Sequence, residues 1–143
     1  MTVQDATKLH GDEHVKVYRE TGGEVGHLWR EGSHTLLLTT TGRKSGEKRT
    51  HALIYGRSGD NYLVVASNGG SEQHPGWYLN LKAEPRVQVQ VMDEVFYADA
   101  RDATPEERPV MWDEMTGHWP AYDDYQQKTG REIPVVVLEP WPR

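Results

Sequence analysis

The sequence of 143 residues contains no cysteine, which excludes disulfides, thiolate metal sites and a cysteine nucleophile. It has no apolar run of about 18 residues or more, and residues 1–30 are mostly polar, so we expect neither a transmembrane helix nor a secretory signal. Excess positive charge is also missing: 16 Lys and Arg residues against 22 Asp and Glu residues give a net charge of -6, which repels nucleic acid and anionic lipid. We therefore expect a cytoplasmic protein without a nucleic-acid partner. Peripheral association with a membrane is left open but is not indicated.

A chain of this length is expected to form one domain with a modest core. Residues 1–33 are polar and dotted with glycine, which predicts a partly mobile N-terminal segment with one short helix over residues 12–21. The pattern changes at His34, so residues 34–143 are predicted to form the folded domain.

Apolar and alternating segments predict about six strands joined mainly by hairpin turns. In chain order they are HTLLLTTT (34–41), THALIYGR (50–57), YLVVAS (62–67), RVQVQVM (86–92), VFYADAR (95–101) and IPVVVLEP (133–140). The expected fold is mainly β with flanking helices, and its antiparallel sheet is expected to curl into a small barrel.

The helices are predicted by their end signals. HPGWYLNLKAEP (74–85) predicts a short helix that ends before Pro85. The segment TPEE, residues 104–107, predicts the start of a helix, with threonine at the N-cap, proline at N1 and glutamate at N3. This helix is expected to end near Gly117, and another short helix to follow Pro120. The inward-facing residues of the first are expected to be Val110, Met111 and Met115.

The segment TTTGRKSGEKRT, residues 39–50, concentrates positive charge in an acidic protein. Four of the 16 cationic residues lie in it: Arg43, Lys44, Lys48 and Arg49. Its glycines let the backbone approach a ligand, and the cations can make charge-assisted hydrogen bonds to phosphate. The spacing is not that of a Walker loop, because no Lys-Ser or Lys-Thr pair follows Gly46. Two interpretations are open: an anion site, or a solvated hairpin tip whose lysines protect a sheet edge.

The segment HGDEH, residues 10–14, matches the H-x-x-E-H spelling of a zinc-binding helix. A zinc site would need His10 and His14 on one face of a stable helix together with a third ligand. Gly11 interrupts the segment, and so short a match arises easily by chance in a chain with 7 histidines. We therefore predict no metal site and expect both histidines in solvent.

Two aromatic segments are candidates for a ligand pocket. In WPAYDDY, three-residue steps put Trp119, Tyr122 and Tyr125 on one face of a helix, where they either pack on the sheet or form a flat-ring pocket with phenol donors. GWYLN, residues 76–80, combines apolar anchors with one amide that can bind the edge of a ligand ring, and Leu79 is expected to pack in the core. No G-x-S-x-G elbow exists, which argues against a serine hydrolase. What remains is ligand binding, with the chemistry carried by a bound organic cofactor.

Several collinear segments resemble the deazaflavin-dependent nitroreductase family. They are LLLTTTGRKSGEKRT, VVASNGGSEQHPGWYLNLKAEPRVQVQV, ARDATPEER and IPVVVLEP. The resemblance runs from about Thr35 to Pro140 and implies a split β-barrel of the FMN-binding kind. It also implies an enzyme that binds coenzyme F420, an 8-hydroxy-5-deazaflavin whose phosphodiester carries a polyglutamate tail. The reduced coenzyme of such an oxidoreductase delivers hydride to a small-molecule acceptor, namely a quinone, a nitroaromatic or a similar electron-poor compound.

The resemblance also implies site residues. The phosphate of the coenzyme is expected at Arg43, Lys44, Ser45 and Arg49. The residues expected beside its ring system, or closing its groove, are Thr50, His51, Ala52, Leu53, Ile54, Val65, Ala66, Ser67, Asn68, Gly76, Trp77, Tyr78, Leu79 and Asn80. The acceptor side is expected to comprise Trp119, Tyr122 and Tyr125, with Tyr122 also touching the coenzyme. Tyr122 and Tyr125 are the catalytic candidates, because a phenol can donate a hydrogen bond or the final proton to the acceptor.

One departure and two alternatives accompany this interpretation. Relatives often carry R-x-x-P-L after the basic turn, whereas Ala52 stands in the proline position here. The alternatives are a non-catalytic carrier of F420 or a similar anionic ligand, and a split-barrel reductase that uses FMN. The four cations of the turn favour a long polyanionic tail over the single phosphate of FMN. Neither the oligomeric state nor the physiological acceptor is predicted.

Overall fold

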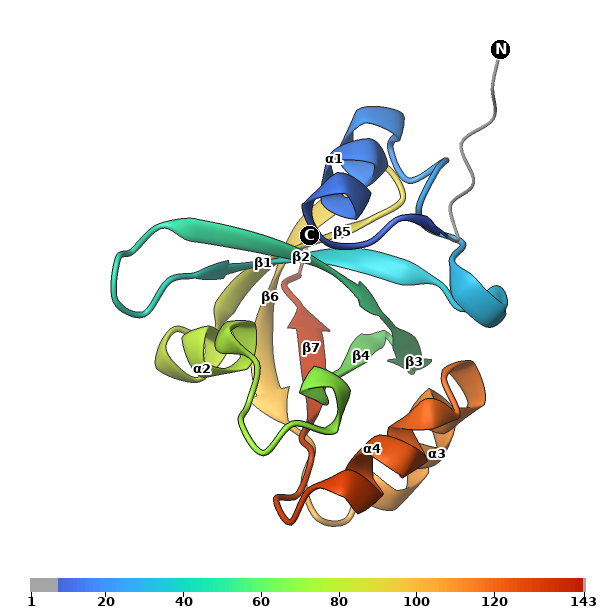
Figure 1. Ribbon diagram of the computed structural model, residues 1–143. Coiled ribbons are helices and arrows are strands. Elements are labelled where there is room, and N and C mark those ends of the chain that lie inside the picture. The colour runs from blue at the N-terminus through green and yellow to red at the C-terminus, as the bar shows by residue number, and fades with distance from the viewer. Residues whose placement is uncertain (1–7, 143) are drawn as a thin grey trace.

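The computed structural model describes residues 8–142, and this part of the chain forms one curled sheet with helices around it (Figure 1). The helical elements are α1 (Gly11–Thr21), the 3₁₀ turn η2 (Arg30–Gly32), the 3₁₀ turn η3 (Asn68–Gly70), α2 (Gly76–Ala83), α3 (Arg108–His118) and α4 (Ala121–Lys128). The strands are β1 (Thr35–Thr41), β2 (Lys48–Ile54), β3 (Gly56–Ser58), β4 (Asn61–Val65), β5 (Arg86–Val91), β6 (Glu94–Asp102) and β7 (Val135–Pro140). No helix in this range is long and apolar enough to span a bilayer.

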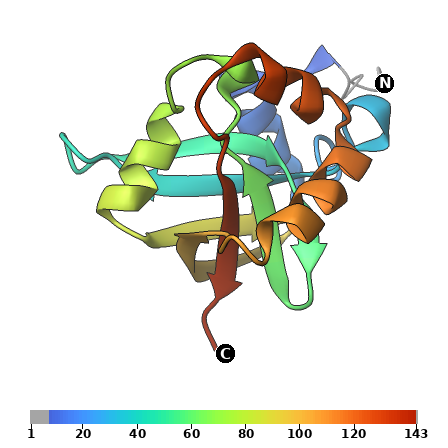
Figure 2. The same ribbon diagram turned by 90° about the horizontal axis from the view of Figure 1, so that it is seen from below.

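All strand pairs are antiparallel, and the order across the sheet is β2-β1-β5-β6-β7-β4-β3. The sheet curls into a half-barrel, so β2 and β4 come near one another although they are not neighbours in the order. Figure 2 shows α2 beside one side of this curl and α3 and α4 beside the other. The prediction of a mainly β split barrel is confirmed.

The predicted strand THALIYGR is in fact two strands, which gives seven strands in the described residues where about six were expected. The chain leaves β2 at Ile54, turns at Tyr55 and enters β3 at Gly56. β2 pairs with β1, while β3 pairs with β4 at the other end of the sheet. The apolar run from Ala52 to Tyr55 spans this corner, so the sequence pattern alone does not reveal the break.

Helix α1 confirms the helix predicted over residues 12–21, and it packs on the outer face of β1 and β2. Val15 and Tyr18 form a buried cluster with Leu37 of β1. The Tyr18 hydroxyl donates to the carbonyl of Thr35 at 3.0 Å. His14 is not solvated as expected: it is 2% exposed and its ring bonds the carbonyl of Gly26 at 2.9 Å. The division of the chain at residue 33 stays a prediction.

Helix α3 begins after the predicted capping box. The backbone N–H of Glu107 donates to Thr104 Oγ1 at 3.2 Å, and the Thr104 N–H donates to the Glu107 carboxylate at 2.9 Å, so a turn precedes the regular helix at Arg108. Met111 and Met115 are buried as predicted, but Val110 is 74% exposed, so that expectation was wrong. Residues four apart share a helix face, whereas Val110 lies about 100° around the axis from Met111.

Candidate functional site

The tip of the β1–β2 hairpin forms a basic hollow of about 230 Å³. Its lining residues are Gly42, Arg43, Lys44, Ser45, Arg49 and Asn80. The turn is closed by hydrogen bonds from the Gly42 N–H to the Glu47 carbonyl (2.7 Å) and from the Gly46 N–H to the Gly42 carbonyl (2.8 Å). A Cβ at Gly42 would lie 3.1 Å from the Glu47 carbonyl oxygen, so this tight turn favours glycine. The hollow therefore contains four of the residues predicted to bind phosphate.

Asn80 of α2 fixes the conformation of the basic turn. Its side-chain oxygen accepts from the backbone N–H of Arg43 at 3.2 Å and from the Arg43 guanidinium at 2.9 Å. Its amide nitrogen donates to Thr40 Oγ1 at 3.2 Å, and the side chain is buried. The sequence suggested that this amide reads a ring edge of the ligand. In the structure both of its polar atoms instead hold Arg43 and β1 in place.

An aromatic cleft of about 290 Å³ lies near the other end of β2. Its lining residues are Trp29, Arg30, Ala52, Leu53, Ile54, Val65, Ser67, Gly69, Trp119, Tyr122 and Tyr125. They come from the segment before β1, from β2 and β4, from η3 and from the α3–α4 region. The cleft thus brings together many residues predicted to lie beside the ring system and all three predicted acceptor residues.

The wall of the cleft contains a stacked pair of tryptophans. The rings of Trp29 and Trp119 are 5.8 Å apart between centroids and inclined by 22°. The Trp29 indole N–H donates to the carbonyl of Leu9 at 2.9 Å, and the Arg30 guanidinium lies over the Trp29 ring. Trp29 and Arg30 were missed from the sequence, because they belong to the segment predicted to be partly mobile and contact the cleft only through the fold.

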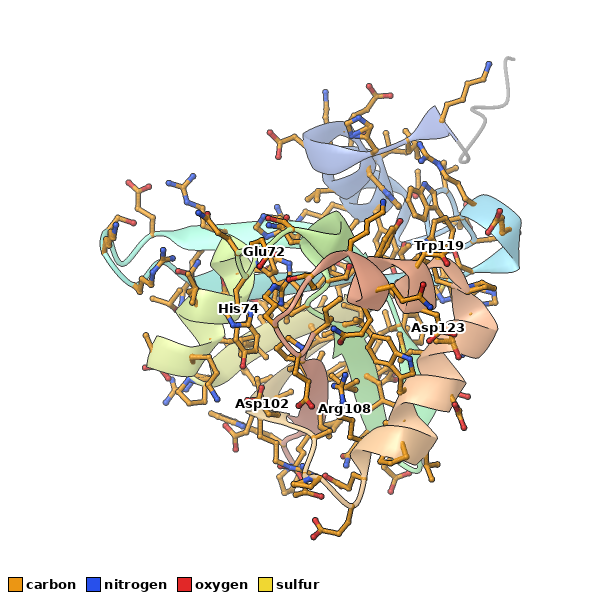
Figure 3. All side chains as sticks on the ribbon, turned by 60° about the horizontal axis from the view of Figure 1, so that its bottom comes forward. Glu72, His74, Asp102, Arg108, Trp119 and Asp123 are labelled. Atoms are coloured by element: carbon orange, nitrogen blue, oxygen red, sulfur yellow. The ribbon has the colours of Figure 1, made fainter. Side chains whose placement is uncertain are left out.

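The three predicted acceptor residues do not share a helix. Trp119 caps the end of α3, as Figure 3 shows, whereas Tyr122 and Tyr125 belong to α4. The chain turns between the helices at Pro120, so the expected single helical face was wrong. The residues nevertheless converge: the Trp119 indole N–H lies 3.4 Å from the Tyr125 hydroxyl, and the rings of Tyr122 and Tyr125 meet edge to face at 6.1 Å.

Tyr122 is the most enclosed polar group of the cleft, with 6% of its surface exposed. Burial, with a smaller contribution from Tyr125, raises the pKa of the Tyr122 phenol well above its ordinary value of 10. The phenol is therefore fully protonated near neutral pH and presents an O–H donor. This favours hydrogen-bond donation over proton transfer by this group.

The segment from Ala66 to Ser71, which borders the cleft, is held by Arg131. The Arg131 guanidinium donates to the carbonyls of Ser67 and Ser71, each at 2.8 Å. Gly70 in this segment has a φ of +85°, and a Cβ there would lie 3.0 Å from the Tyr125 carbonyl oxygen. Glycine thus allows η3 to approach α4 closely enough to border the cleft.

Some predicted site residues lie outside the hollow and the cleft. Trp77 and Tyr78 are buried in the barrel core, and the Tyr78 O–H donates to the Asp102 carboxylate at 2.9 Å. Figure 3 shows Asp102 far from Trp119. Leu79 is 37% exposed, so the expectation that it packs in the core was wrong.

The other predicted residues outside both sites are Thr50, His51, Ala66, Asn68 and Gly76, of which Thr50 and His51 line a further cavity beneath α1.

The chemistry of the two sites fits an elongated ligand with an anionic end and a flat ring. The hollow offers cations and a hydroxyl, which suit phosphate, and the cleft offers aromatic and aliphatic walls, which suit a ring. Backbone of β2 connects the two from Arg49 to Leu53. The fold is a split barrel, and the two sites have the chemistry expected of an organic cofactor site that follows one strand.

Comparison with known proteins identifies the family. The family model described as F420H(2)-dependent quinone reductase matches residues 11–140. An F420H(2)-dependent quinone reductase of Mycobacterium tuberculosis is 42% identical over 128 residues, which cover 87% of this chain and 86% of that protein. The chain therefore belongs to the F420H(2)-dependent quinone reductase family. It is an oxidoreductase with coenzyme F420 as its cofactor, as predicted.

Solved structures agree with this assignment. An F420-H2 dependent reductase, FDR-A, is 44% identical and superposes with a TM-score of 0.68, covering 73% of this chain and 93% of that one. The heme storage protein HutZ of Vibrio cholerae reaches a TM-score of 0.60 at 15% identity, covering 94% and 93% of the two chains, and shows the fold alone.

Proposed function

We propose that this protein reduces a small quinone with F420H(2), and that the coenzyme lies along β2 with its phosphate in the basic hollow and its ring in the aromatic cleft. The observation that carries the proposal is the position of these two sites at opposite ends of one strand. At a rise of about 3.3 Å per residue, β2 separates Arg49 from Leu53 by roughly 13 Å. An extended ligand is required to reach both.

At the hollow, the role of the protein is to bind charge. Arg43, Lys44 and Arg49 surround it, and the Ser45 hydroxyl adds a donor. Charge-assisted hydrogen bonds from such groups to phosphate are about twice as strong as neutral ones. Asn80 presents Arg43 in a fixed orientation, which lowers the entropy cost of binding. These residues anchor the coenzyme without taking part in the chemistry.

At the cleft, the role of the protein is to orient the ring of the coenzyme and the acceptor relative to one another. When bound, the coenzyme supplies hydride-transfer chemistry. The ring system would rest on the part of the cleft lined by residues 52–54 of β2 together with Val65 and Ser67. Trp29, Trp119 and Tyr125 form the wall against which an acceptor ring would stack. Tyr122 donates its O–H to the acceptor oxygen on which negative charge develops.

The same geometry supports reduction of a nitroaromatic compound, because a nitro group also combines an electron-poor flat ring with an oxygen that accepts a hydrogen bond. The protein would treat both acceptors alike: it stacks the ring and donates a hydrogen bond to the oxygen. A cytoplasmic location remains our expectation for the enzyme.

The proposal is tested by binding and turnover measured side by side. Fluorescence titration with F420 and with FMN should show tighter binding of F420, and tighter binding of FMN would contradict the assignment of the hollow. Loss of absorbance of F420H(2) after addition of menadione, or of a nitroaromatic compound, should report turnover. Binding of F420 without any turnover would show a carrier instead of a reductase.

A further inference from the structure

A cavity of about 600 Å³ lies between α1 and β2 and is larger than the hollow or the cleft. Its lining residues are Asp12, Val15, Lys16, Arg19, Glu20, Lys48, Arg49, Thr50 and His51. Figure 1 shows α1 on one side of the β1–β2 ribbon and α2 on the other, so this cavity and the hollow flank β2 from opposite sides. The function proposed above leaves most of this cavity without a role.

The cavity carries excess positive charge. Lys16 and Arg19 are three residues apart and project from one face of α1, while Lys48 and Arg49 come from β2. The carboxylates of Asp12 and Glu20 oppose these four cations only in part, and His51 is the other titratable group in the lining. Glu47, outside the lining, lies 3.6 Å from Arg49, so Lys16, Arg19 and Lys48 carry the excess charge. In a chain of net charge -6, such a concentration of cations indicates an anionic ligand.

Hydrogen bonds hold two of these cations along β2. The Arg19 guanidinium donates to Thr50 Oγ1 at 2.8 Å, and Thr50 Oγ1 lies 2.7 Å from Thr39 Oγ1 on β1. Lys48 Nζ donates to Thr41 Oγ1 at 2.7 Å. The hydroxyls are neutral partners, so both cations keep their full charge for a ligand.

Arg49 lines both the cavity and the basic hollow, so the two lie next to one another across the edge of β2. β2 is the terminal strand of the sheet, and among the described residues no strand pairs with its outer edge beside Arg49. A flexible chain that leaves a phosphate in the hollow can therefore pass over this edge and enter the cavity. The coenzyme has such a chain, because several glutamates follow its phosphate.

We propose that the cavity between α1 and β2 is a second anionic subsite, which binds the carboxylates of the coenzyme's oligoglutamate tail through Lys16, Arg19 and Lys48. This inference rests on the proposed function, which places the phosphate at Arg43, Lys44 and Ser45. It assigns α1 a role in distinguishing coenzymes by tail length. The carboxylates are bound by exposed cations, so each contact contributes modestly and the number of glutamates sets the total.

The test compares two forms of the coenzyme by fluorescence titration: one with several glutamates, and one that keeps the phosphate but lacks the glutamates. Replacement of both α1 cations (Lys16→Ala with Arg19→Ala) should raise the Kd of the tailed form about fivefold to tenfold and leave the Kd of the truncated form unchanged. Lys16→Glu tests the charge alone and leaves the Arg19–Thr50 hydrogen bond intact. Glu20→Gln should have the opposite effect and lower the Kd of the tailed form. Arg86→Ala, which removes an exposed cation outside both cavities, is the matched control.

The outcomes separate this inference from the proposed function. If the α1 variants weaken the binding of both forms equally, or of neither form, the tail subsite is overturned. If Lys44→Ala does not weaken binding of the truncated form, the placement of the phosphate is overturned instead. Raising the salt concentration should reduce the preference of the wild type for the tailed form, and a preference that is independent of salt would also contradict the subsite.

Discussion

The two ends of β2 differ in how the sequence builds them. The basic end is formed by a continuous stretch, residues 42–49, supported by the single amide of Asn80. The aromatic end is assembled from segments as distant as Trp29 and Tyr125. Local sequence therefore specifies the anion site, whereas the cleft exists only once the barrel has closed.

The two ends also differ in exposure. The Arg49 side chain is 61% exposed and its ion pair with Glu47 is long, at 3.6 Å, while Tyr122 is 6% exposed. Exposed cations act through their number and charge and are screened by salt. Buried groups act through fixed geometry. We therefore expect changes at the basic end to alter coenzyme affinity and changes at the aromatic end to alter turnover.

The largest effect is expected from Lys44→Ala combined with Arg49→Ala. If each makes a charge-assisted hydrogen bond to the phosphate, at ~1.5–3 kcal/mol, the pair should lose about 3 kcal/mol or more, which is roughly 100-fold in Kd. The turnover number at saturating F420H(2) should stay near that of the wild type. Fluorescence titration and steady-state kinetics measure the two quantities. An unchanged Kd would show that the hollow does not bind the coenzyme.

The complementary change is Tyr122→Phe at the aromatic end. Removal of one hydrogen bond to the charged oxygen should lower kcat about tenfold, while the Kd of F420 stays nearly constant. Because burial raises the pKa of the phenol, it remains protonated, and the kcat of the wild type should show no loss from ionisation of Tyr122 up to about pH 10. Tyr97→Phe, which removes an exposed phenol outside the cleft, is the matched control. An unchanged kcat in Tyr122→Phe would remove this tyrosine from the mechanism.

The basic end and most of the fold could be predicted from sequence because their signals are local. The alternation of apolar and polar residues predicted β5 and β6, and the capping box predicted the start of α3. The glycines among the cations of residues 42–49 predicted the tip of the β1–β2 hairpin. The break at Tyr55 could not be seen, since an apolar run from Ala52 to Tyr55 leads into it without a turn signal. The positions of the predicted Trp77 and Tyr78 in the core could not be seen either, because a short helix with apolar residues all round does not reveal which face is buried.

The role of Trp29 is the clearest case of missing information. Nothing near it in the sequence indicates a site, and its partner Trp119 is reached only through the tertiary structure. The exposed basic turn, by contrast, had both a local composition signal and a family resemblance. Predictions about the cleft are therefore the sharper test of the fold itself.

Trp29→Ala removes one half of the stacked pair. An aromatic pair is worth about 0.5–1.5 kcal/mol beyond its buried area, so the KM of a quinone acceptor should rise about threefold to tenfold. The Kd of F420 should change much less if Trp29 faces the acceptor. Kinetics with menadione at saturating F420H(2) measures the first quantity, and titration measures the second. If the Kd of F420 changes more than the KM of the quinone, Trp29 contacts the coenzyme and not the acceptor.

The smallest effect is expected at the start of α3, the helix that ends at Trp119, where Arg101 of β6 contacts Glu107 and the neighbouring strand. Its guanidinium donates to the Glu107 carboxylate at 2.7 Å and lies 3.3 Å from Glu139 of β7. The hydrogen bond from Arg101, together with the Thr104 N–H, lowers the pKa of Glu107 to about 2. Because this pKa is depressed on folding, the stabilisation is present above the ordinary value of 4.5 and is lost as pH falls toward 2.

Glu107→Gln should therefore be less stable than the wild type at neutral pH, and the difference should shrink as pH falls from about 4.5 to 2. Urea unfolding at several pH values measures it, with Glu106→Gln as the exposed neighbouring control. The effect should be modest, because the Glu107 side chain is 31% exposed and water screens the pair. A difference that stays constant with pH would mean that Glu107 contributes through the shape of the capping box and not through its charge.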